Sequence, residues 1–109
     1  EFKEMNAPVL SNFSSEAHKT DGSKSPELLY NQLFKPVNWL GCMQTASRME
    51  IEIIIEFGGG IGEGASPNEK RPNLEGITKK NFRNLKSEVI YLPAINASTI
   101  EEASKSNYQ

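Results

Sequence analysis

The stretch EIEIIIEF, residues 50–57, limits the possible folds of this chain more than any other feature. Its apolar residues are β-branched and nearly continuous, and the run is too short for a typical buried helix. It therefore predicts a β-strand. Continuous rather than alternating apolar residues are typical of strands covered on both faces, as in parallel sheets. The run GGGIGEGASPNEKRPN follows at once and predicts a loop, because Gly and Pro are dense in it.

The rest of the chain alternates predicted strands and helices. Ser25 can cap a helix and Pro26 suits its first turn, so a helix is expected from there until Pro36 ends it. The other predicted elements are a buried strand at residues 7–12, a helix at 39–48, a helix at 74–86, a strand at 88–93 and a terminal helix opened by a capping box of Ser98 and Glu101.

This order predicts an α/β fold: a partial three-layer arrangement in which flanking helices cover a parallel sheet. The sheet would contain three strands. A sheet that thin has an open edge and an uncovered face, so we expect the chain to work as part of something larger. Its 109 residues suffice for one small domain, with a Gly/Pro-rich loop at about residues 58–73.

Charge and cysteine content exclude several classes of protein. The net charge of −2 argues against a nucleic-acid binder, which would usually carry a basic patch. Four basic residues do gather near the predicted third helix, and a solvated helix face explains them better than a phosphate site does: Lys79, Lys80, Arg83 and Lys86. No apolar run is long enough to cross a membrane.

Two reactive residue types occur once each. Cys42 has no second thiol for a disulfide or a zinc site, so we expect a buried small hydrophobic residue in a reducing compartment. His18 lies in the polar stretch SSEAHKTDGSKS, without a second ligand or an evident catalytic partner. We therefore expect His18 to be a surface loop residue.

The glycine-rich loop also matches a loose nucleotide-binding pattern. Residues 60–65 satisfy G-x-G-x-x-G/A, in which bare backbone approaches a pyrophosphate at a helix N-terminus. Pro67 and the NEKRPN run argue that no helix opens there, so the context that would confirm the motif is missing. A flexible turn at the end of a strand is the favoured interpretation.

Four blocks in order, APVLSN, LLYNQLFKPVNW, IIIEFGGG and LEGITKK, resemble the C-terminal part of the malonyl-CoA:acyl-carrier-protein transacylases. The closing EVIYLPAINASTIEEA is similar to that family's last strand and helix, so the resemblance covers nearly the whole chain. It implies the C-terminal segment of the large subdomain of an acyltransferase. The complete enzyme would move a malonyl group from coenzyme A to acyl carrier protein through an acyl-serine intermediate, in fatty acid or polyketide synthesis.

The resemblance also implies a role for Gln32. In the family, the main-chain carbonyl of the glutamine in this block is bonded to the catalytic histidine. Such a carbonyl accepts from one imidazole nitrogen and leaves the other to take the serine proton. Without the resemblance, Gln32 would be an exposed polar residue near a helix end.

The chain departs from the family where the chemistry is done. No G-x-S-x-G surrounds its candidate serines (Ser11, Ser25, Ser66 and Ser98), and His18 does not match the catalytic histidine. The malonyl-binding arginine of the family has no match among Arg48, Arg71 and Arg83. Residues 61–73, after Gly58–Gly60, look like an insertion into the corresponding loop of the family.

Two hypotheses about function therefore stay open. In the first, the chain is inactive alone and completes an acyltransferase with an N-terminal remainder or a companion chain. That enzyme would use malonyl-CoA as substrate and acyl carrier protein as partner, with no tightly bound cofactor, in the cytoplasm or an organelle such as a mitochondrion or plastid. In the second, the chain is a non-catalytic structural or interaction module of a larger assembly.

Overall fold

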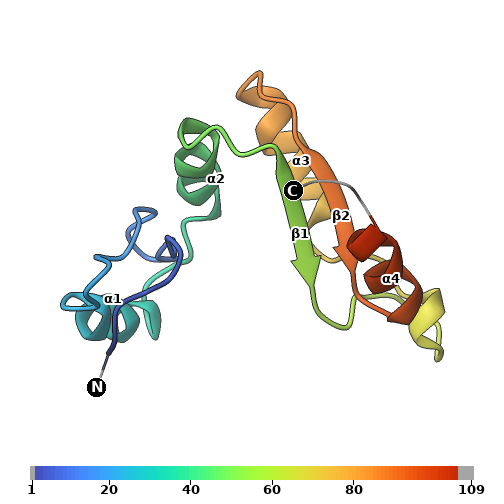
Figure 1. Cartoon of the computed structure of the whole chain (residues 1–109), viewed down its shortest axis with the longest axis horizontal. Helices are drawn as coiled ribbons and strands as arrows, with labels where there is room; N and C mark the ends of the chain where they lie inside the picture. Colours follow the sequence, from blue (N-terminus) through green and yellow to red (C-terminus); the bar gives the residue numbers. More distant parts are fainter. Residues whose placement is uncertain (1, 106–109) are drawn as a thin grey trace. The chain divides into compact units, whose positions relative to one another are not determined.

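The structure is a computed structural model that describes residues 2–105. The chain divides into two compact units, Glu1–Met49 and Glu50–Gln109. Within the described residues the elements are four α-helices, two β-strands and one short 3-10 helix, so the chain is a mixed α/β protein (Figure 1). None of the helices in residues 2–105 has the length and apolar character needed to cross a membrane.

The first helix of the N-terminal unit, α1, spans Ser25–Gln32, so a helix lies where the sequence predicts one, and it ends four residues before Pro36. The predicted cap is wrong, because Ser25 is itself the first helical residue and Lys24 occupies the cap position without a side-chain cap bond. The Ser25 hydroxyl is instead 3.0 Å from Nδ1 of His18. Pro26 stands in the first turn, where its missing N–H costs the helix nothing.

The second helix, α2, spans Trp39–Arg48 and confirms the predicted bounds. Asn38 caps it, with Oδ1 accepting from the backbone N–H of Gly41 at 3.0 Å. Its inward face buries Cys42, Met43 and Ala46 at 3%, 9% and 7% exposure. This helix supplies most of the buried apolar side chains of the N-terminal unit.

The strand predicted at residues 7–12 is wrong. Only Leu10 pairs there, with Ala17, in an isolated antiparallel bridge. The chain reverses directly after Leu10, because the Ser11 hydroxyl accepts from the backbone N–H groups of Phe13 and Ser14, each at 3.2 Å. A local turn of this kind satisfies the backbone without a sheet, and residues 7–9 stay exposed.

The C-terminal unit is a strand–helix–strand motif. β1 (Ile53–Phe57) and β2 (Ile90–Ala94) pair in parallel, with Ile53 opposite Ile90 and Phe57 opposite Ala94. The helix α3 (Glu75–Asn84) connects them, as a parallel pair requires. The sheet of the described residues has two strands rather than the predicted three, because residues 7–12 add none.

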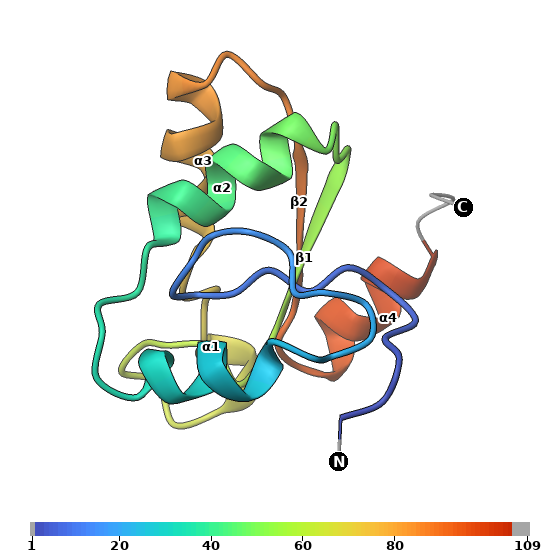
Figure 2. The ribbon, with the colours of Figure 1, turned by 90° about the vertical axis from the view of Figure 1, so that its left-hand side faces the viewer.

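The two α-helices of this unit, α3 and α4 (Ala97–Lys105), lie on opposite faces of its sheet. Figures 1 and 2 show α3 on one face and α4 on the other, beside β2. Thr78 and Phe82 form the buried stripe of α3, each 1% exposed, at a helical spacing of four residues. Ala94 and Ile95, at the end of β2, are buried at 4% and 6%.

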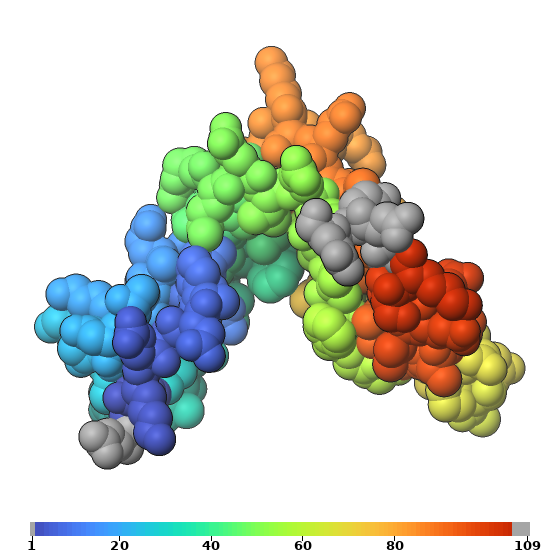
Figure 3. All heavy atoms as spheres, viewed as in Figure 1, coloured from blue at the N-terminus to red at the C-terminus, as the bar shows by residue number. Residues whose placement is uncertain are grey.

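The prediction that β1 is covered on both faces is wrong within this unit. Ile55 and Phe57 are 43% and 77% exposed. Alternate residues of a strand share a face, so both belong to the face opposite Glu56, whose carboxylate bonds the start of α3. Figure 3 shows β1, in light green, at the surface of the unit beside α4. α4 contacts β2, and this leaves the β1 side of the face open.

The terminal helix is present where the sequence predicts it, but its cap differs. Oδ1 of Asn96 accepts from the backbone N–H of Thr99 at 2.9 Å, and Oγ1 of Thr99 accepts from the N–H of Asn96 at 3.1 Å. These reciprocal bonds form a capping box two residues before the predicted pair of Ser98 and Glu101. The helix therefore begins at Ala97, ahead of Ser98.

Candidate functional site

Gln32, the residue singled out by the sequence, is the last residue of α1. Its side chain is exposed, and within residues 2–105 the amide makes no hydrogen bond. The last turn of the helix carries no basic residue. The helix holds the backbone carbonyl of Gln32 in place, whereas no hydrogen bond holds its side chain, so the carbonyl is the group to consider as a site.

The Gln32 carbonyl stands where the hydrogen-bond ladder of the helix stops. The N–H of Lys35 still donates to the carbonyl of Asn31 at 2.9 Å, in the α-helical i to i−4 pattern. The next bond in that ladder would run from residue 36 to Gln32, but residue 36 is Pro and has no N–H. Among residues 2–105 no donor is bonded to the Gln32 carbonyl.

Apolar side chains surround this open carbonyl in the sequence. Tyr30, Leu33 and Phe34 are 64%, 82% and 58% exposed. The rings of Tyr30 and Phe34 contact each other edge to face, with centroids 5.3 Å apart. An acceptor flanked by exposed apolar side chains has the character of a contact surface rather than of an ordinary solvated helix end.

His18 is buried, whereas the sequence predicts an exposed residue. It is only 8% exposed, so the expectation of a surface loop residue is wrong. Its Nδ1 is 3.0 Å from the hydroxyl of Ser25, which is 1% exposed. Ser11 and Ser15 are buried in the same unit, at 1% and 5%. The polar stretch around His18 gave no sign of this burial. A buried His needs a hydrogen-bond partner, and only the fold brings Ser25 to it.

The His18–Ser25 pair does not have the geometry of a serine nucleophile with its base. The serine sits at the start of a helix with its hydroxyl buried, whereas a nucleophile elbow exposes the hydroxyl on a sharp turn after a strand. Within residues 2–105 no carboxylate is hydrogen-bonded to the ring. We therefore assign the pair to holding the start of α1.

Cys42 is buried at 3%, which confirms the expectation of a small hydrophobic residue. Its Sγ is 3.5 Å from the carbonyl oxygen of Ser11. Burial raises the pKa of the Cys42 thiol above its ordinary value of 9.0. A buried thiol of raised pKa has little thiolate and is a poor nucleophile.

Glu56 is a polar residue in the apolar strand β1, and the sequence pattern did not predict a site there. Its carboxylate accepts from the backbone N–H groups of Asn73 at 2.7 Å and of Leu74 at 3.0 Å, and from the hydroxyl of Tyr91. Burial tends to raise the pKa of Glu56, but the bonds from Tyr91, Leu74 and Asn73 outweigh it and hold the pKa below 4.5.

The Glu56 cluster anchors the start of α3 rather than presenting a free carboxylate. Burial and the neighbouring Glu56 carboxylate raise the pKa of Tyr91 well above 10.0, so the phenol stays protonated and keeps donating. Both carboxylate oxygens of Glu56 are engaged. A Glu that interrupts an apolar run was the sequence signal for this contact.

The glycine-rich loop is closed by hydrogen bonds. Ile61 and Arg71 exchange two backbone bonds, of 2.8 Å and 2.9 Å, as an isolated antiparallel bridge. A 3-10 helix, Pro67–Glu69, follows Ser66, where a phosphate-binding motif would need an α-helix. Gly60 adopts φ +69, a left-handed conformation that favours Gly. Backbone hydrogen bonds therefore hold this loop in a defined conformation.

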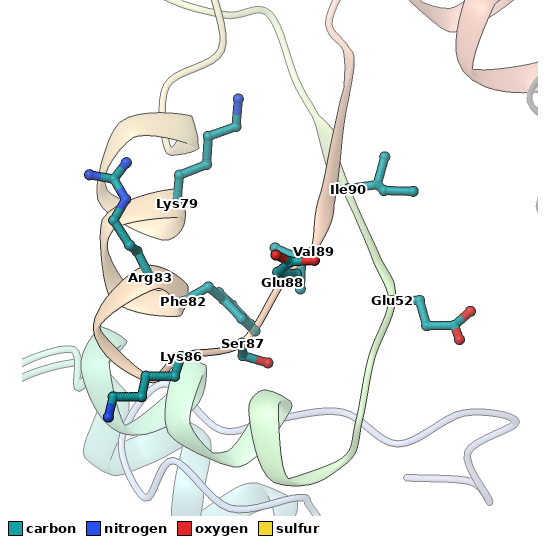
Figure 4. Close-up of a pocket in the computed structure, with 9 residues that line it drawn as sticks. All are labelled: Glu52, Lys79, Phe82, Arg83, Lys86, Ser87, Glu88, Val89 and Ile90. Carbon is teal, nitrogen blue, oxygen red and sulfur yellow. The ribbon is translucent and has the colours of Figure 1, made fainter.

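A hollow of about 760 Å³ lies beside α3 in the C-terminal unit, with Phe82, Val89 and Ile90 among the residues that line it. Figure 4 shows the Phe82 ring pointing from α3 toward the start of β2. The charged ends of Lys79, Arg83 and Lys86 point in different directions there, and so do not converge on one anion. Lys79 is already paired with Glu75 at 2.5 Å.

No group of three or more His, Cys, Asp or Glu side chains that could hold a metal ion occurs within residues 2–105. Comparison of the chain with protein-family models, with curated proteins and with solved structures found no match. The Gln32 carbonyl is the candidate site within residues 2–105 because it is an unbonded acceptor at a helix end, next in the sequence to exposed apolar side chains.

Proposed function

We propose that this chain is the C-terminal portion of an acyltransferase that resembles malonyl-CoA:acyl-carrier-protein transacylase. The complete enzyme transfers a malonyl group from coenzyme A to the phosphopantetheine thiol of acyl carrier protein. This portion supplies sheet strands and the helix that carries Gln32. The serine nucleophile and its histidine are supplied by an N-terminal remainder or by a companion chain.

The observation that carries the proposal is the unbonded carbonyl of Gln32. A carbonyl at the C-terminus of a helix is the negative end of the helix dipole, so it attracts a donor with positive character. An imidazole N–H is such a donor. This matches the function that the family assigns to the backbone of this glutamine, and it requires nothing of the glutamine side chain.

The chemical consequence concerns the tautomer of the histidine. When the Gln32 carbonyl accepts from one ring nitrogen, the other nitrogen is unprotonated and can take the serine proton. The serine oxygen then attacks the thioester carbonyl, and the coenzyme A thiol leaves with that proton. Attack by the carrier thiol on the acyl-serine reverses the same proton transfers.

The exposed apolar side chains of each unit support contact with a partner. In the N-terminal unit Leu33 is 82% exposed, and in the C-terminal unit Phe57 is 77% exposed. Exposed apolar side chains that gather, as those of Tyr30, Leu33 and Phe34 do along the sequence, favour contact with another protein surface. The same exposure also favours the second candidate function, a non-catalytic interaction module in a larger assembly.

Malonyl labelling of the native assembly distinguishes the two functions. The assembly is purified through this chain, incubated with labelled malonyl-CoA and analysed by intact mass spectrometry under denaturing conditions. We expect a malonyl adduct on a serine within a G-H-S-x-G sequence outside residues 1–109, and transfer to acyl carrier protein. The 109-residue chain alone should show no transfer above buffer. An assembly with no acyl-serine supports the non-catalytic module instead.

Substitutions at Gln32 test the backbone role. Gln32→Ala keeps the carbonyl and should leave malonyl transfer by the complete enzyme within a few-fold of the native rate. Gln32→Pro disrupts the last turn of α1 and should lower it far more, because Pro removes a helical donor and clashes with the preceding turn. Equal losses in the two variants would overturn the assignment.

A further inference from the structure

We infer that Pro36 is a positioning residue: it keeps the Gln32 carbonyl open for a donor outside α1. The inference rests on the proposed function for its catalytic meaning, and on the backbone geometry for its physical content. The proposed role of Pro36 involves no contact with substrate. Pro36 acts through Gln32. In an α-helix the N–H of residue 36 would bond to the Gln32 carbonyl, and Pro is the one residue type without that N–H.

The donors around the end of α1 show why residue 36 matters. Leu33 donates to Tyr30 at 3.2 Å, Phe34 to Asn31 at 3.3 Å, and Lys35 to Asn31 at 2.9 Å. The backbone thus keeps a helix-like hydrogen-bond pattern for three residues past Gln32. An N–H at position 36 would be the next donor in this series, and its acceptor would be Gln32.

Two nearby donors are committed elsewhere. The N–H of Asn38 donates to the carbonyl of Asn12 at 2.8 Å. The side-chain amide of Asn31 donates to the carbonyl of Glu27 at 2.9 Å. Within residues 2–105, neither the helix nor the segment after it supplies a donor to Gln32, so the carbonyl is held available by local sequence alone.

The variant Pro36→Ala supplies the missing N–H with little change in size. We expect α1 to lengthen by one hydrogen bond, from residue 36 to Gln32. A helical bond contributes on the order of a few-fold to tenfold in equilibrium population. An external imidazole would then have to displace or share this bond, and its hold on the carbonyl should weaken by a similar factor.

The first measurement uses the 109-residue chain itself. Backbone NMR of the native chain should give a Gln32 carbonyl carbon shift typical of an unbonded carbonyl, upfield of the bonded Asn31 carbonyl. In Pro36→Ala the Gln32 carbon should move downfield, and the new amide at position 36 should exchange with solvent at least about threefold more slowly than an unprotected amide. Lys35→Ala, which retains Pro36, is the matched control and should leave the Gln32 shift unchanged.

The second measurement uses the complete enzyme. Pro36→Ala should lower kcat for malonyl transfer by about three- to tenfold, the factor expected for one hydrogen bond. Loss of an acceptor that favours the imidazolium should also move the acidic limb of the pH–rate profile to lower pH. An imino acid without an N–H at position 36, such as pipecolic acid, should restore both values. A loss of stability alone would not shift the profile.

The two measurements separate the inference from the proposed function. An unshifted Gln32 carbon and an unprotected amide in Pro36→Ala overturn the inference, whatever the activity. A shifted carbon and a protected amide support it. Should kcat and the pH profile then stay native, the Gln32 carbonyl does not serve a catalytic histidine and the proposed function of the site is overturned. Where the variant fails to fold, the native chain's own shifts still test the premise: a Gln32 carbon as far downfield as the bonded Asn31 carbon would show a closed carbonyl and overturn the inference.

Discussion

Tyr91 donates its hydroxyl to the carboxylate of Glu56 across the two paired strands of the C-terminal unit. Pro93, two residues after Tyr91, stands directly opposite Glu56, so the pair is a diagonal one on the α3 face of the sheet. Glu56 also receives the backbone N–H groups of Asn73 and Leu74, just before α3. One carboxylate therefore joins both strands to the start of the connecting helix.

Loss of the Glu56 carboxylate should loosen the start of α3. In Glu56→Ala the amides of Asn73 and Leu74 lose their acceptor, and we expect them to exchange with solvent at least about tenfold faster, since a bond to a charged group contributes about 1.5–3 kcal/mol. Hydrogen exchange followed by NMR measures this. Glu52→Ala is the control, because the side chain of Glu52 is exposed. Equal exchange in the two variants would contradict the anchoring role.

Acid should release the same anchor. The pKa of folded Glu56 lies below the ordinary value of 4.5, so the ionised carboxylate stabilises the folded form above about that pH. This contribution is lost as the pH falls through the folded pKa. A ¹³C titration of the Glu56 carboxyl should give a midpoint below 4.5, and the protection of the Leu74 amide should fall with it. A midpoint above 4.5 would show that burial outweighs the hydrogen bonds.

Two glycines should respond oppositely to alanine. Gly60 has φ +69, and an added Cβ would lie 2.8 Å from the carbonyl oxygen of Arg71, so Gly60→Ala should destabilise the loop by about 1–3 kcal/mol. Gly76 lies within α3 with no atom within 4 Å of the added Cβ. Gly76→Ala should stabilise the helix by about 0.5–1 kcal/mol. Urea unfolding midpoints followed by circular dichroism would reveal the two signs.

The capping residue of α4 is testable by a matched pair. Asn96→Ala removes the acceptor for the Thr99 N–H and should cost about 1 kcal/mol of helix stability. Ser98→Ala changes an exposed residue inside the helix and should alter stability by less than about 0.5 kcal/mol. Amide exchange rates across α4 measure both. A larger effect at Ser98 would restore the cap that the sequence pattern suggests.

The buried pair of the N-terminal unit should be needed for α1. Ser25→Ala leaves Nδ1 of buried His18 without its partner, at a cost of about 1–3 kcal/mol. Ser98→Ala is again the control, as an exposed serine on another helix. Histidine ring shifts and amide exchange in α1 would report the loss. A Ser25→Ala chain with native exchange rates in α1 would show that the pair does not hold the helix.

The sequence predicted those elements whose signals are local. Pro36 stops α1 because a missing N–H acts within one turn, and the apolar spacing of α2 located both of its ends. The β-branched run of β1 and the apolar residues of β2 identified a parallel pair separated by a helix. The open carbonyl of Gln32 is also a local property, since it depends only on residues four apart.

The tertiary structure decided what depends on partners distant in the sequence. The segment at residues 7–12 carries a strand-like composition, but Ser11 turns the chain back, and no strand of residues 2–105 forms a ladder with it. His18 reads as a solvated residue until Ser25 approaches its ring, and Glu56 reads as a flaw in a strand until Tyr91 and the start of α3 surround it. For His18 and Glu56, a hydrogen bond to another segment makes the burial of a polar group tolerable, and residue propensities along the chain do not contain that partner.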